Sequence, residues 1–467
     1  MNHFPNLESR ISNLELCLGS WVLGAGVMAL GVWAFCLWTA ERIVEAEPTA
    51  AGFARALRWN PRADAYHAML GNSYRNYLKG QDLDRSVREL RQAIAIRPRA
   101  WTHYQDLAVT QELRGDFAAA EAAFRQAVSL NPHHTQLRWQ VANYYLRRQD
   151  LPRAMSAFRA AVELDPGRLT FAANRLNAIG ASVENIGAHL VPARRPDLLT
   201  FLYFVLQQLE AEPRRAGRLA WETWQKWVSA PAVEPFQIGS LFSYIQYLIR
   251  TGELEKAGQV WRAGLAAAGL RQTDDGAEAA DDPAAGFVFN SGFETPALNG
   301  GLDWVLPNHP EVCYEYDHEI RVQGGESLRI DFAGKSNLDF HGPRETVLLP
   351  AGRLQLSFVI RTENITSDQG ICLEVRSWVG NALLARSEAA RGTRPWTRMT
   401  QEFTLNRPGA AYIVVRRYPS GKPADTLSGK VWLDEVDVKQ NSKFEIRDSR
   451  LGKTSRDSRL GETSRNF

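Results

Sequence analysis

The sequence predicts a multidomain α and β protein: a single transmembrane helix, an all-α repeat solenoid and an all-β jelly-roll sandwich. Three observations support this: a long uncharged segment early in the chain, a regular spacing of prolines behind it, and alternating strand-like patterns in the last third. A chain of 467 residues is too long for one hydrophobic core. The predicted parts are an N-terminal segment (1–15), a transmembrane helix (16–40), a solenoid (45–270), a linker (271–286), a sandwich (287–440) and a disordered tail (441–467).

The first predicted element is a membrane anchor. Residues 16–40 carry no charge, and a helix of that length rises about 37 Å, more than the roughly 30 Å hydrocarbon core. The run is too long for the core of a signal peptide, and Trp38 stands where a small residue would precede cleavage. Lysine and arginine counts beside the span favour a cytoplasmic C-terminal part, yet long soluble domains translocate largely regardless of charge. The type of module at the C-terminal end argues for a location outside the cytoplasm. We therefore expect a single-pass protein of the bacterial inner membrane with its bulk in the periplasm.

Behind the anchor the sequence repeats itself. Pro98, Pro132 and Pro166 follow one another at 34-residue intervals, and small and aromatic residues recur at matching offsets between them, as in Ala120, Phe124, Ala127 and Ala154, Phe158, Ala161. These segments resemble the tetratricopeptide repeat (TPR), a helical hairpin of that length. The alanines let the two helices approach closely, and the large residues fill the seam. We expect five or six hairpins, less regular beyond Pro166, with about three extra residues around 79–81.

The TPR resemblance implies a concave groove that binds a peptide or a partner protein. The groove positions of the family fall on Asn72, Arg75, Gln105, Glu112, Trp139, Asn143 and Arg147. Family members that capture a C-terminal carboxylate have a basic residue one turn before the first asparagine, where this chain has Ala68. Carboxylate capture is therefore not expected. The alternative is that these polar residues only solvate the helix faces.

From residue 287 the hydrophobic pattern has a period of two. Leu354, Leu356, Phe358 and Ile360 alternate with polar residues, and the segments 370–378, 396–404, 410–418 and 430–438 behave likewise. Strands of this kind separated by Gly/Pro turns predict a sandwich or jelly roll. Four markers occur in order: the Asn-Ser-Gly-Phe-Glu motif at 290–294, Trp304, Trp396 before a strand ending in Phe403, and the Gly-Lys-Val-Trp-Leu-Asp-Glu-Val motif at 429–436. Together they resemble the galactose-binding-like carbohydrate modules.

That resemblance implies a structural calcium ion. In the family, the glutamate of the opening motif and the aspartate of the closing motif often share such an ion, and carboxylate oxygens suit a hard cation. The matching residues are Glu294 and Asp434, with Asn290 as a further candidate ligand. The alternative is a pair of carboxylates that binds no metal.

The resemblance also implies sugar recognition on an exposed sheet face. Strand alternation puts the aliphatic residues of 371–378 and 411–418 on one side, and on the other the candidate ligand-binding residues Arg376, Trp378, Tyr412, Arg416 and Tyr418. Trp304, Trp396 and Trp432 occupy core positions of the family. Because many modules of this fold bind protein instead of sugar, fold alone does not decide the ligand.

Several classes of function are not expected. The net charge of +3 is spread thinly, so we predict no nucleic-acid partner. There is no nucleotide loop, protease motif or paired catalytic carboxylate, which predicts a protein that is not an enzyme. No Cys-x-x-Cys motif occurs, so a zinc site is not expected; Cys313 and Cys372 could form a disulfide or remain free thiols.

Two hypotheses for the function remain. The first is an envelope protein of exopolysaccharide or O-antigen-type polysaccharide assembly or export, in which the TPR groove docks a protein and the sandwich contacts the glycan. An anchor followed at once by TPR hairpins resembles the C-terminal part of some O-antigen ligase and polymerase proteins. The second is a protein–protein scaffold whose sandwich binds no sugar.

Overall fold

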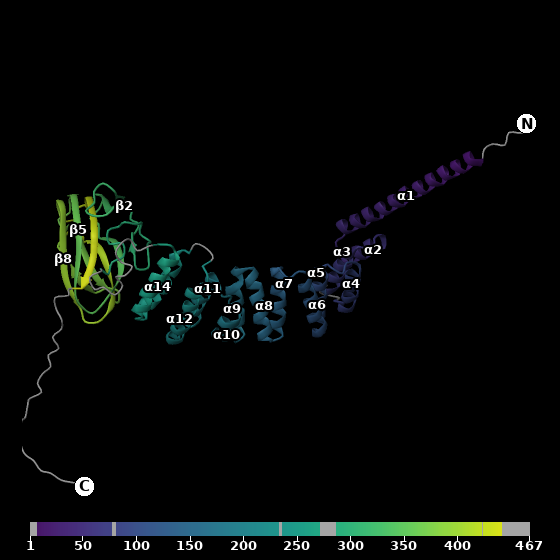
Figure 1. Ribbon diagram of the computed structural model, residues 1–467, viewed down its shortest axis with the longest axis horizontal. Helices are drawn as coiled ribbons and strands as arrows, with labels where there is room; N and C mark the ends of the chain where they lie inside the picture. The colour runs from purple at the N-terminus through teal and green to yellow at the C-terminus, as the bar shows by residue number, and fades with distance from the viewer. Residues whose placement is uncertain (1–6, 77–80, 233–235, 271–285, 423, 441–467) are drawn as a thin grey trace, which may run out of the picture. The chain divides into compact units, whose positions relative to one another are not determined.

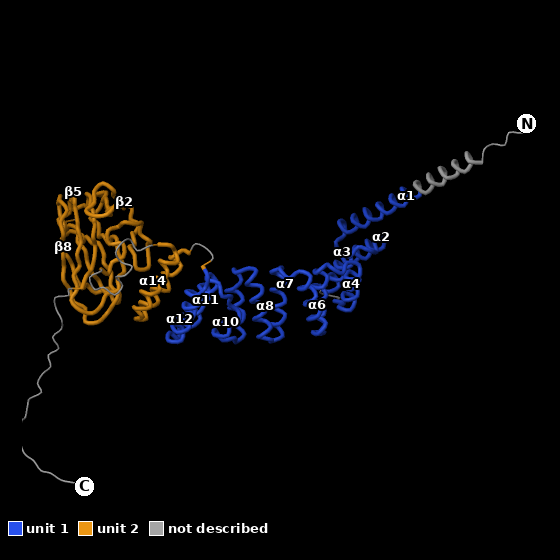
Figure 2. The backbone as a smooth tube through the Cα atoms, viewed as in Figure 1, with its two compact units in different colours: residues 1–231 blue, residues 232–467 orange. Residues whose placement is uncertain are grey.

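The computed structural model describes residues 7–76, 81–232, 236–270, 286–422 and 424–440, with side chains from residue 25 onward. The predicted tail, nearly all of the predicted linker and most of the insertion near residue 80 lie outside these ranges. The chain forms two compact units, residues 1–231 and 232–467, which are shown in different colours in Figure 2. The boundary differs from the predicted domain limits, because the last helical pair belongs to the same unit as the sandwich.

The first unit begins with the long helix α1, Leu7–Ala46. Its described part contains one stretch, Ala25–Ala46, that is long and apolar enough to cross a membrane, and only 6% of its most apolar window is buried. Large apolar side chains are therefore exposed along it, with Met28 at 72% and Trp33 at 61%. A helix of this kind is expected of a membrane anchor or of a signal sequence.

The rest of the first unit consists of short helices that follow one another as antiparallel pairs (Figure 1). They are α2 (Ala50–Trp59), α3 (Asp64–Asn76), α4 (Leu83–Ile96), α5 (Trp101–Arg114), α6 (Phe117–Leu130), α7 (Thr135–Arg147), α8 (Leu151–Leu164), the 3₁₀ turn η1 (Pro166–Arg168), α9 (Leu169–Ala178), α10 (Val183–His189), α11 (Arg195–Gln208) and α12 (Pro213–Ser229). The predicted repeat architecture is confirmed.

The 34-residue period appears in the local structure of the repeats. The second helix of each regular hairpin is capped by an aspartate whose side chain accepts a hydrogen bond from a backbone amide in the first turn; these are Asp82, Asp116 and Asp150. The alanines at the helix seams, Ala93, Ala127 and Ala161, are completely buried. Any larger side chain there would separate the two helices of a hairpin.

The second unit opens with the last helical pair. It comprises η2 (Ile238–Leu241), α13 (Phe242–Arg250) and α14 (Leu254–Ala267). The Trp261 ring meets Phe289 edge to face at 5.4 Å. A Cβ atom placed on Gly301 would lie 2.4 Å from Trp261, so the glycine permits the helix to approach the loop before the first strand closely. The last helical pair thus packs against the sandwich.

The sandwich has two five-stranded antiparallel sheets, coloured green to yellow in Figure 1. One sheet, in the order β1-β4-β9-β6-β7, contains Trp304–Val305, Phe340–Leu349, Gly409–Arg417, Cys372–Ser377 and Leu383–Arg386. The other, in the order β2-β3-β10-β5-β8, contains Val312–Asp317, Ser327–Ala333, Ser428–Gln440, Gly352–Ile365 and Gly392–Leu405. We call them the first and the second sheet. One apolar core lies between them, and it includes the predicted alternating residues Leu354, Leu356, Phe358 and Ile360.

The three family-position tryptophans have different environments. Trp304 is fully buried in the core against Phe293. Trp432 is also buried, but it faces outward from the second sheet, where its indole N–H donates to Asp317 at 2.8 Å. Trp396 is only half-buried and lies outside the core cluster. The expected buried position is therefore confirmed for Trp304 and Trp432, whereas Trp396 is only partly buried.

The two cysteines of the sandwich are free thiols. Cys313 lies opposite Asp331 on the second sheet, and Cys372 lies opposite Arg416 on the first sheet. Both alternate with core residues of their own sheets and so point away from the core on opposite sides of the sandwich. A disulfide between them would require a Cα separation below about 7 Å, which this arrangement excludes.

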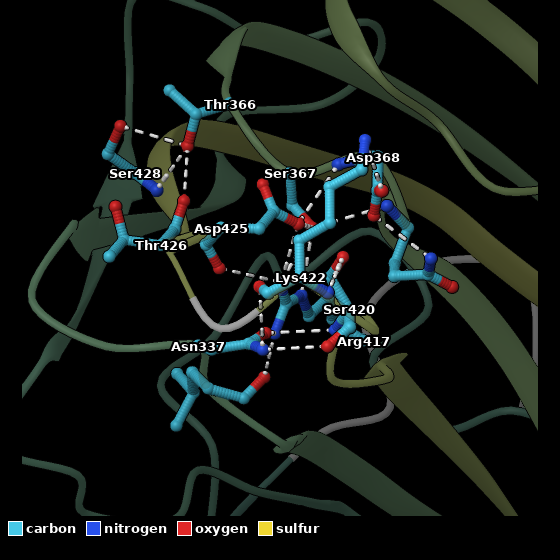
Figure 3. A network of polar contacts seen from close by, with 12 residues as sticks. Asn337, Thr366, Ser367, Asp368, Arg417, Ser420, Lys422, Asp425, Thr426 and Ser428 are labelled. Atoms are coloured by element: carbon cyan, nitrogen blue, oxygen red, sulfur yellow. Dashed lines mark hydrogen bonds and ion pairs between the residues drawn. The ribbon is translucent and has the colours of Figure 1, made fainter.

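A buried arginine fixes three loops at one end of the sandwich (Figure 3). Arg417 is fully buried, and its guanidinium donates to Asn337 Oδ1 at 2.6 Å and to Ser367 Oγ at 2.8 Å. It also pairs with the Asp425 carboxylate at 3.3 Å. Burying this charge is tolerable because every side of the guanidinium meets an acceptor. The network joins three loops that each connect a strand of one sheet to a strand of the other.

Candidate functional site

The first sheet carries an open pocket of about 570 Å³ on its outer face. Cross-strand register puts Arg376 opposite Tyr412 and Glu374 opposite Val414, and all four alternate with core residues. The lining consists of Val305, Pro307, His341, Gly342, Arg344, Arg376, Trp378, Gly380, Asn381, Tyr412 and Val414. The volume lies within the range typical of ligand pockets.

Two local irregularities shape this pocket. In β4 the register shifts between His341 and Arg344, where Gly342 and Pro343 form a bulge. As a result both basic residues face outward, although a regular strand would place residues three apart on opposite faces. After β6 the chain reverses through Gly380 and Asn381, both with positive φ, and Arg376 donates to the Asn381 carbonyl at 2.7 Å. This turn presents Trp378 at the rim.

A fully buried carboxylate organises the floor beside the pocket. Glu374 accepts from Arg376 at 2.7 Å, from Arg386 at 2.6 Å and from the Tyr418 hydroxyl at 2.8 Å. Burial acts to raise the pKa of Glu374, but its hydrogen bonds with Arg376, Tyr418 and Arg386 outweigh it and the pKa is lowered. The glutamate is therefore charged at neutral pH and holds both arginines in place.

The predicted ligand-binding residues divide into two groups. Arg376, Trp378 and Tyr412 line the pocket. Tyr418 is instead held in the Glu374 cluster, and Arg416 is only 3% exposed, donating to the Phe340 carbonyl and pairing with Asp339 at 3.0 Å. These two support the face from beside the pocket, and their role in binding stays a prediction.

Sequence reasoning missed the two basic residues of β4. His341 is largely exposed and lies 3.7 Å from Asp339, and partial desolvation together with the nearby charge of Arg416 lowers its pKa. Arg344 is exposed, and its guanidinium lies 5.8 Å from the centre of the Tyr412 ring. Within the described residues Arg344 has no carboxylate partner. The Gly-Pro pair between them was the available signal for a bulge.

The predicted metal pair lies on the outer side of the second sheet. Asp434 accepts from the Val322 and Gln323 amides at 2.8 and 3.3 Å, and Glu294 accepts from the Gly325 amide at 2.7 Å. Asp434 Oδ1 also accepts from the Glu435 amide at 2.8 Å, and a Cβ atom placed on Gly292 would lie 3.2 Å from Glu294 Oε1 and 3.6 Å from this oxygen. These two carboxylates could supply part of the six to eight oxygen ligands that calcium takes, and calcium binding here stays a prediction. In the part of the chain that the structure describes, no group of three or more His, Cys, Asp or Glu side chains is arranged to hold a metal ion.

The third candidate ligand, Asn290, is hydrogen-bonded within its own loop, and its role as a ligand stays a prediction. Its side-chain amide donates to the Thr295 carbonyl at 2.7 Å and accepts from the Thr295 amide at 3.2 Å. Both polar atoms are thereby used within the opening loop, where Asn290 has a positive φ of 54°. Asn290 positions the loop that carries Glu294.

In the solenoid, most of the predicted groove residues pair with a residue about one repeat away. Asn72 donates to Asp106 at 2.9 Å, and Arg75 pairs with the same carboxylate at 3.4 Å. Arg147 donates to both oxygens of Glu112, at 2.7 and 2.8 Å. These contacts join the first helices of successive hairpins into a ladder of polar pairs.

One stretch of this surface remains open. A pocket of about 370 Å³ is lined by Val109, Phe124, Gln136, Trp139, Gln140, Asn143, Arg147 and Arg175. It includes three of the predicted groove residues. Trp139 packs edge to face on Phe158 at 4.8 Å, and the guanidinium of Arg175 lies 5.8 Å from its ring. Arg175 donates to Asn143 Oδ1 at 2.9 Å, and it forms no ion pair with a carboxylate among the residues that the structure describes.

Comparison with known proteins supports the repeat assignment. Residues 74–132 and 114–168 match the tetratricopeptide repeat family model. No curated protein matches the sequence. Among solved structures, the chain is similar to TTC0263, a thermophilic TPR protein of Thermus thermophilus, with 21% identity over 34% of this chain and 95% of that one and a TM-score of 0.26. It is also similar to MamA of Desulfovibrio magneticus, with 13% identity over 34% and 89% and a TM-score of 0.28. Similarities at these TM-scores carry no argument about function.

Proposed function

We propose that this chain is a membrane-anchored, non-catalytic scaffold of the bacterial cell envelope that assists polysaccharide assembly or export. The solenoid binds a protein partner, and the sandwich binds the glycan. TPR arrays serve as protein–protein interaction scaffolds, because stacked hairpins expose an extended concave surface. The helix Ala25–Ala46 supplies the anchor.

The observation that carries the glycan half of the proposal is the pocket on the first sheet. Two aromatic rings, Trp378 and Tyr412, lie at one open pocket beside polar side chains and backbone groups. Planar rings stack on the apolar face of a pyranose, and the polar groups beside them can bind hydroxyls. An apolar core below and an open outer face above leave the rings free to meet a polymer.

The glycan half is tested with full-length protein in detergent on an array of neutral and acidic polysaccharides. Trp378→Ala should abolish retention, whereas Val379→Ala should leave it unchanged, since Val379 is 74% exposed in the same turn but does not line the pocket. Equal retention of the two variants would contradict the site. If the wild type binds no polysaccharide, the sandwich is better explained as a second protein-binding surface.

The placement of the chain is tested separately. Alkaline phosphatase fused after residue 270 should be active if the bulk of the chain is periplasmic, because the enzyme needs an oxidising compartment. An inactive phosphatase together with an active cytoplasmic reporter at the same position would reverse the orientation.

A further inference from the structure

The outer face of the first sheet carries an excess of positive charge. Its outward-facing arginines are Arg344 on β4, Arg376 on β6, Arg386 on β7 and Arg416 on β9. Against these four stand two carboxylates in contact with them, Glu374 and Asp339. Among the described residues that line the pocket there is no carboxylate. The field at the pocket therefore favours an anion.

The arginines of this face are not equivalent. Arg376 and Arg386 share the Glu374 carboxylate, and Arg416 pairs with Asp339, so these three guanidinium groups serve the fold. Arg344 pairs with no carboxylate among the residues that the structure describes, and its guanidinium lies 5.8 Å from the centre of the Tyr412 ring. Its guanidinium is exposed and keeps its planar set of donors available. Of the four arginines on this face, Arg344 is the one that has no carboxylate partner in the part of the chain that the structure describes, so it is available to a ligand.

The bulge in β4 explains why Arg344 lies on the outer face of the sheet, beside the pocket. Arg344 lies opposite Val414, next to Tyr412 on β9, while His341 lies opposite Arg416. Without the extra residue at 342–343, one of the two basic residues would point into the core. The strand is thus bent in a way that places Arg344 beside the aromatic rings.

We propose that the pocket binds a carboxylated saccharide, a uronate unit of an acidic polysaccharide, with its carboxylate paired to Arg344 and its ring on Tyr412 and Trp378. A guanidinium fork matches a carboxylate in two parallel hydrogen bonds. Tyr412 is close enough to Arg344 that one pyranose unit can contact the ring while its carboxylate meets the arginine. This inference rests on the proposed glycan function and adds the class of glycan.

The experiment uses full-length protein in detergent and three polymers: polygalacturonate, its fully methyl-esterified form, and dextran sulfate. The first two share one backbone and differ in the carboxylate charge. Polygalacturonate should be retained at least about tenfold more strongly than its methyl ester, and added salt should reduce the difference. Preference for dextran sulfate over polygalacturonate would overturn the assignment to a carboxylate.

Two variants locate the effect. Arg344→Gln should weaken polygalacturonate binding about tenfold and leave binding of the methyl ester unchanged, and it breaks no ion pair that the structure shows. Lys430→Gln is the matched control, because it removes one exposed positive charge from the second sheet, on the other side of the sandwich. Equal losses in the two variants would mean that the attraction is not specific to the pocket.

The outcomes of these experiments distinguish failure of the carboxylate assignment from failure of the proposed glycan binding. If both polymers bind equally and Trp378→Ala abolishes both, the sandwich binds glycan but not through a carboxylate, and the further inference fails alone. If neither the polymers nor any other polysaccharide of the array binds, the glycan function itself fails.

Discussion

The solenoid and the sandwich use their polar side chains differently. In the solenoid most predicted groove residues already bond to a residue of another repeat. For example, Arg147 donates a hydrogen bond to each oxygen of Glu112. Three predicted residues border an open pocket in each region, but the sandwich pocket also contains Arg344, which has no carboxylate partner within the described residues. A residue that recurs in a repeat array finds its counterpart in the next repeat, whereas a residue on a sheet face meets only its cross-strand neighbours. Polar residues at repeat positions are thus weaker evidence of a binding site than polar residues on one sheet face.

The sharpest test within the sandwich compares two tryptophans. Trp304→Ala should destabilise it by about 3–5 kcal/mol, because Trp304 is fully buried in the core. Trp378→Ala should cost about 1 kcal/mol or less, since it removes a half-exposed ring at the pocket rim. The urea midpoint for labelling of the buried thiol Cys372 reports unfolding of this unit. A large loss from Trp378→Ala would mean that this ring serves packing and not binding.

The second prediction is that calcium changes the stability of the sandwich and not that of the solenoid. At a hundredfold excess over its dissociation constant, calcium held by Glu294 and Asp434 should stabilise the sandwich by about 2.7 kcal/mol. The urea midpoint for Cys372 labelling should rise with calcium and fall with a chelator, and Asp434→Asn should remove the response. Hydrogen exchange of solenoid peptides should be unchanged. An identical sandwich midpoint in calcium and chelator would favour the alternative of two carboxylates held by backbone amides.

Much of the fold follows from the two sequence periods. The 34-residue spacing predicts the hairpins, and the same spacing leads from Asn72 to its partner Asp106, so that contact could have been deduced. The period of two correctly places Arg376 and Tyr412 outside. It fails at His341 and Arg344, because a bulge adds a residue to the alternation. It also puts Trp432 on the outer face of its sheet, so the burial of this ring was expected from the family resemblance and not from the alternation.

The third prediction concerns pH, and it applies to the sandwich. Burial raises the pKa of Asp303 from 3.8 to about 6, and burial and the charge of Asp303 raise the pKa of the fully buried Glu345. For both groups the folded-state pKa lies above the unfolded-state pKa. The resulting stability is fully present below the unfolded-state pKa and is lost as pH rises through the folded-state pKa. Deprotonation of Asp303 alone should lower the free energy of unfolding of the sandwich by about 1 kcal/mol between pH 5 and 7.

The measurement is the urea midpoint of Cys372 labelling at the two pH values. Asp303→Asn should make the midpoint less dependent on pH, because the amide is neutral throughout. The lowered pKa of Glu374 has the opposite effect, but that stability is lost below its usual pKa of 4.5, outside the range compared. The lowered pKa of His341 opposes the fall within this range, so the test is the difference between the wild type and Asp303→Asn. The same pH dependence in both proteins would contradict the assigned burial of Asp303.

The smallest expected effect lies in the solenoid ladder. A double-mutant cycle with Glu112→Gln and Arg147→Gln should give a coupling energy of about 0.2–1 kcal/mol, because the Arg147 side chain is 57% exposed and water screens the pair. Hydrogen exchange in α5 and α7 at fixed pH measures it in the intact chain. The stability of the repeats should then depend mainly on the buried alanines between the helices. Loss of the Glu112–Arg147 pair should leave intact the solenoid pocket that Trp139 lines. A coupling above about 2 kcal/mol would mean instead that the ladder holds successive hairpins together, and that Glu112 and Arg147 are structural residues unavailable to a partner protein.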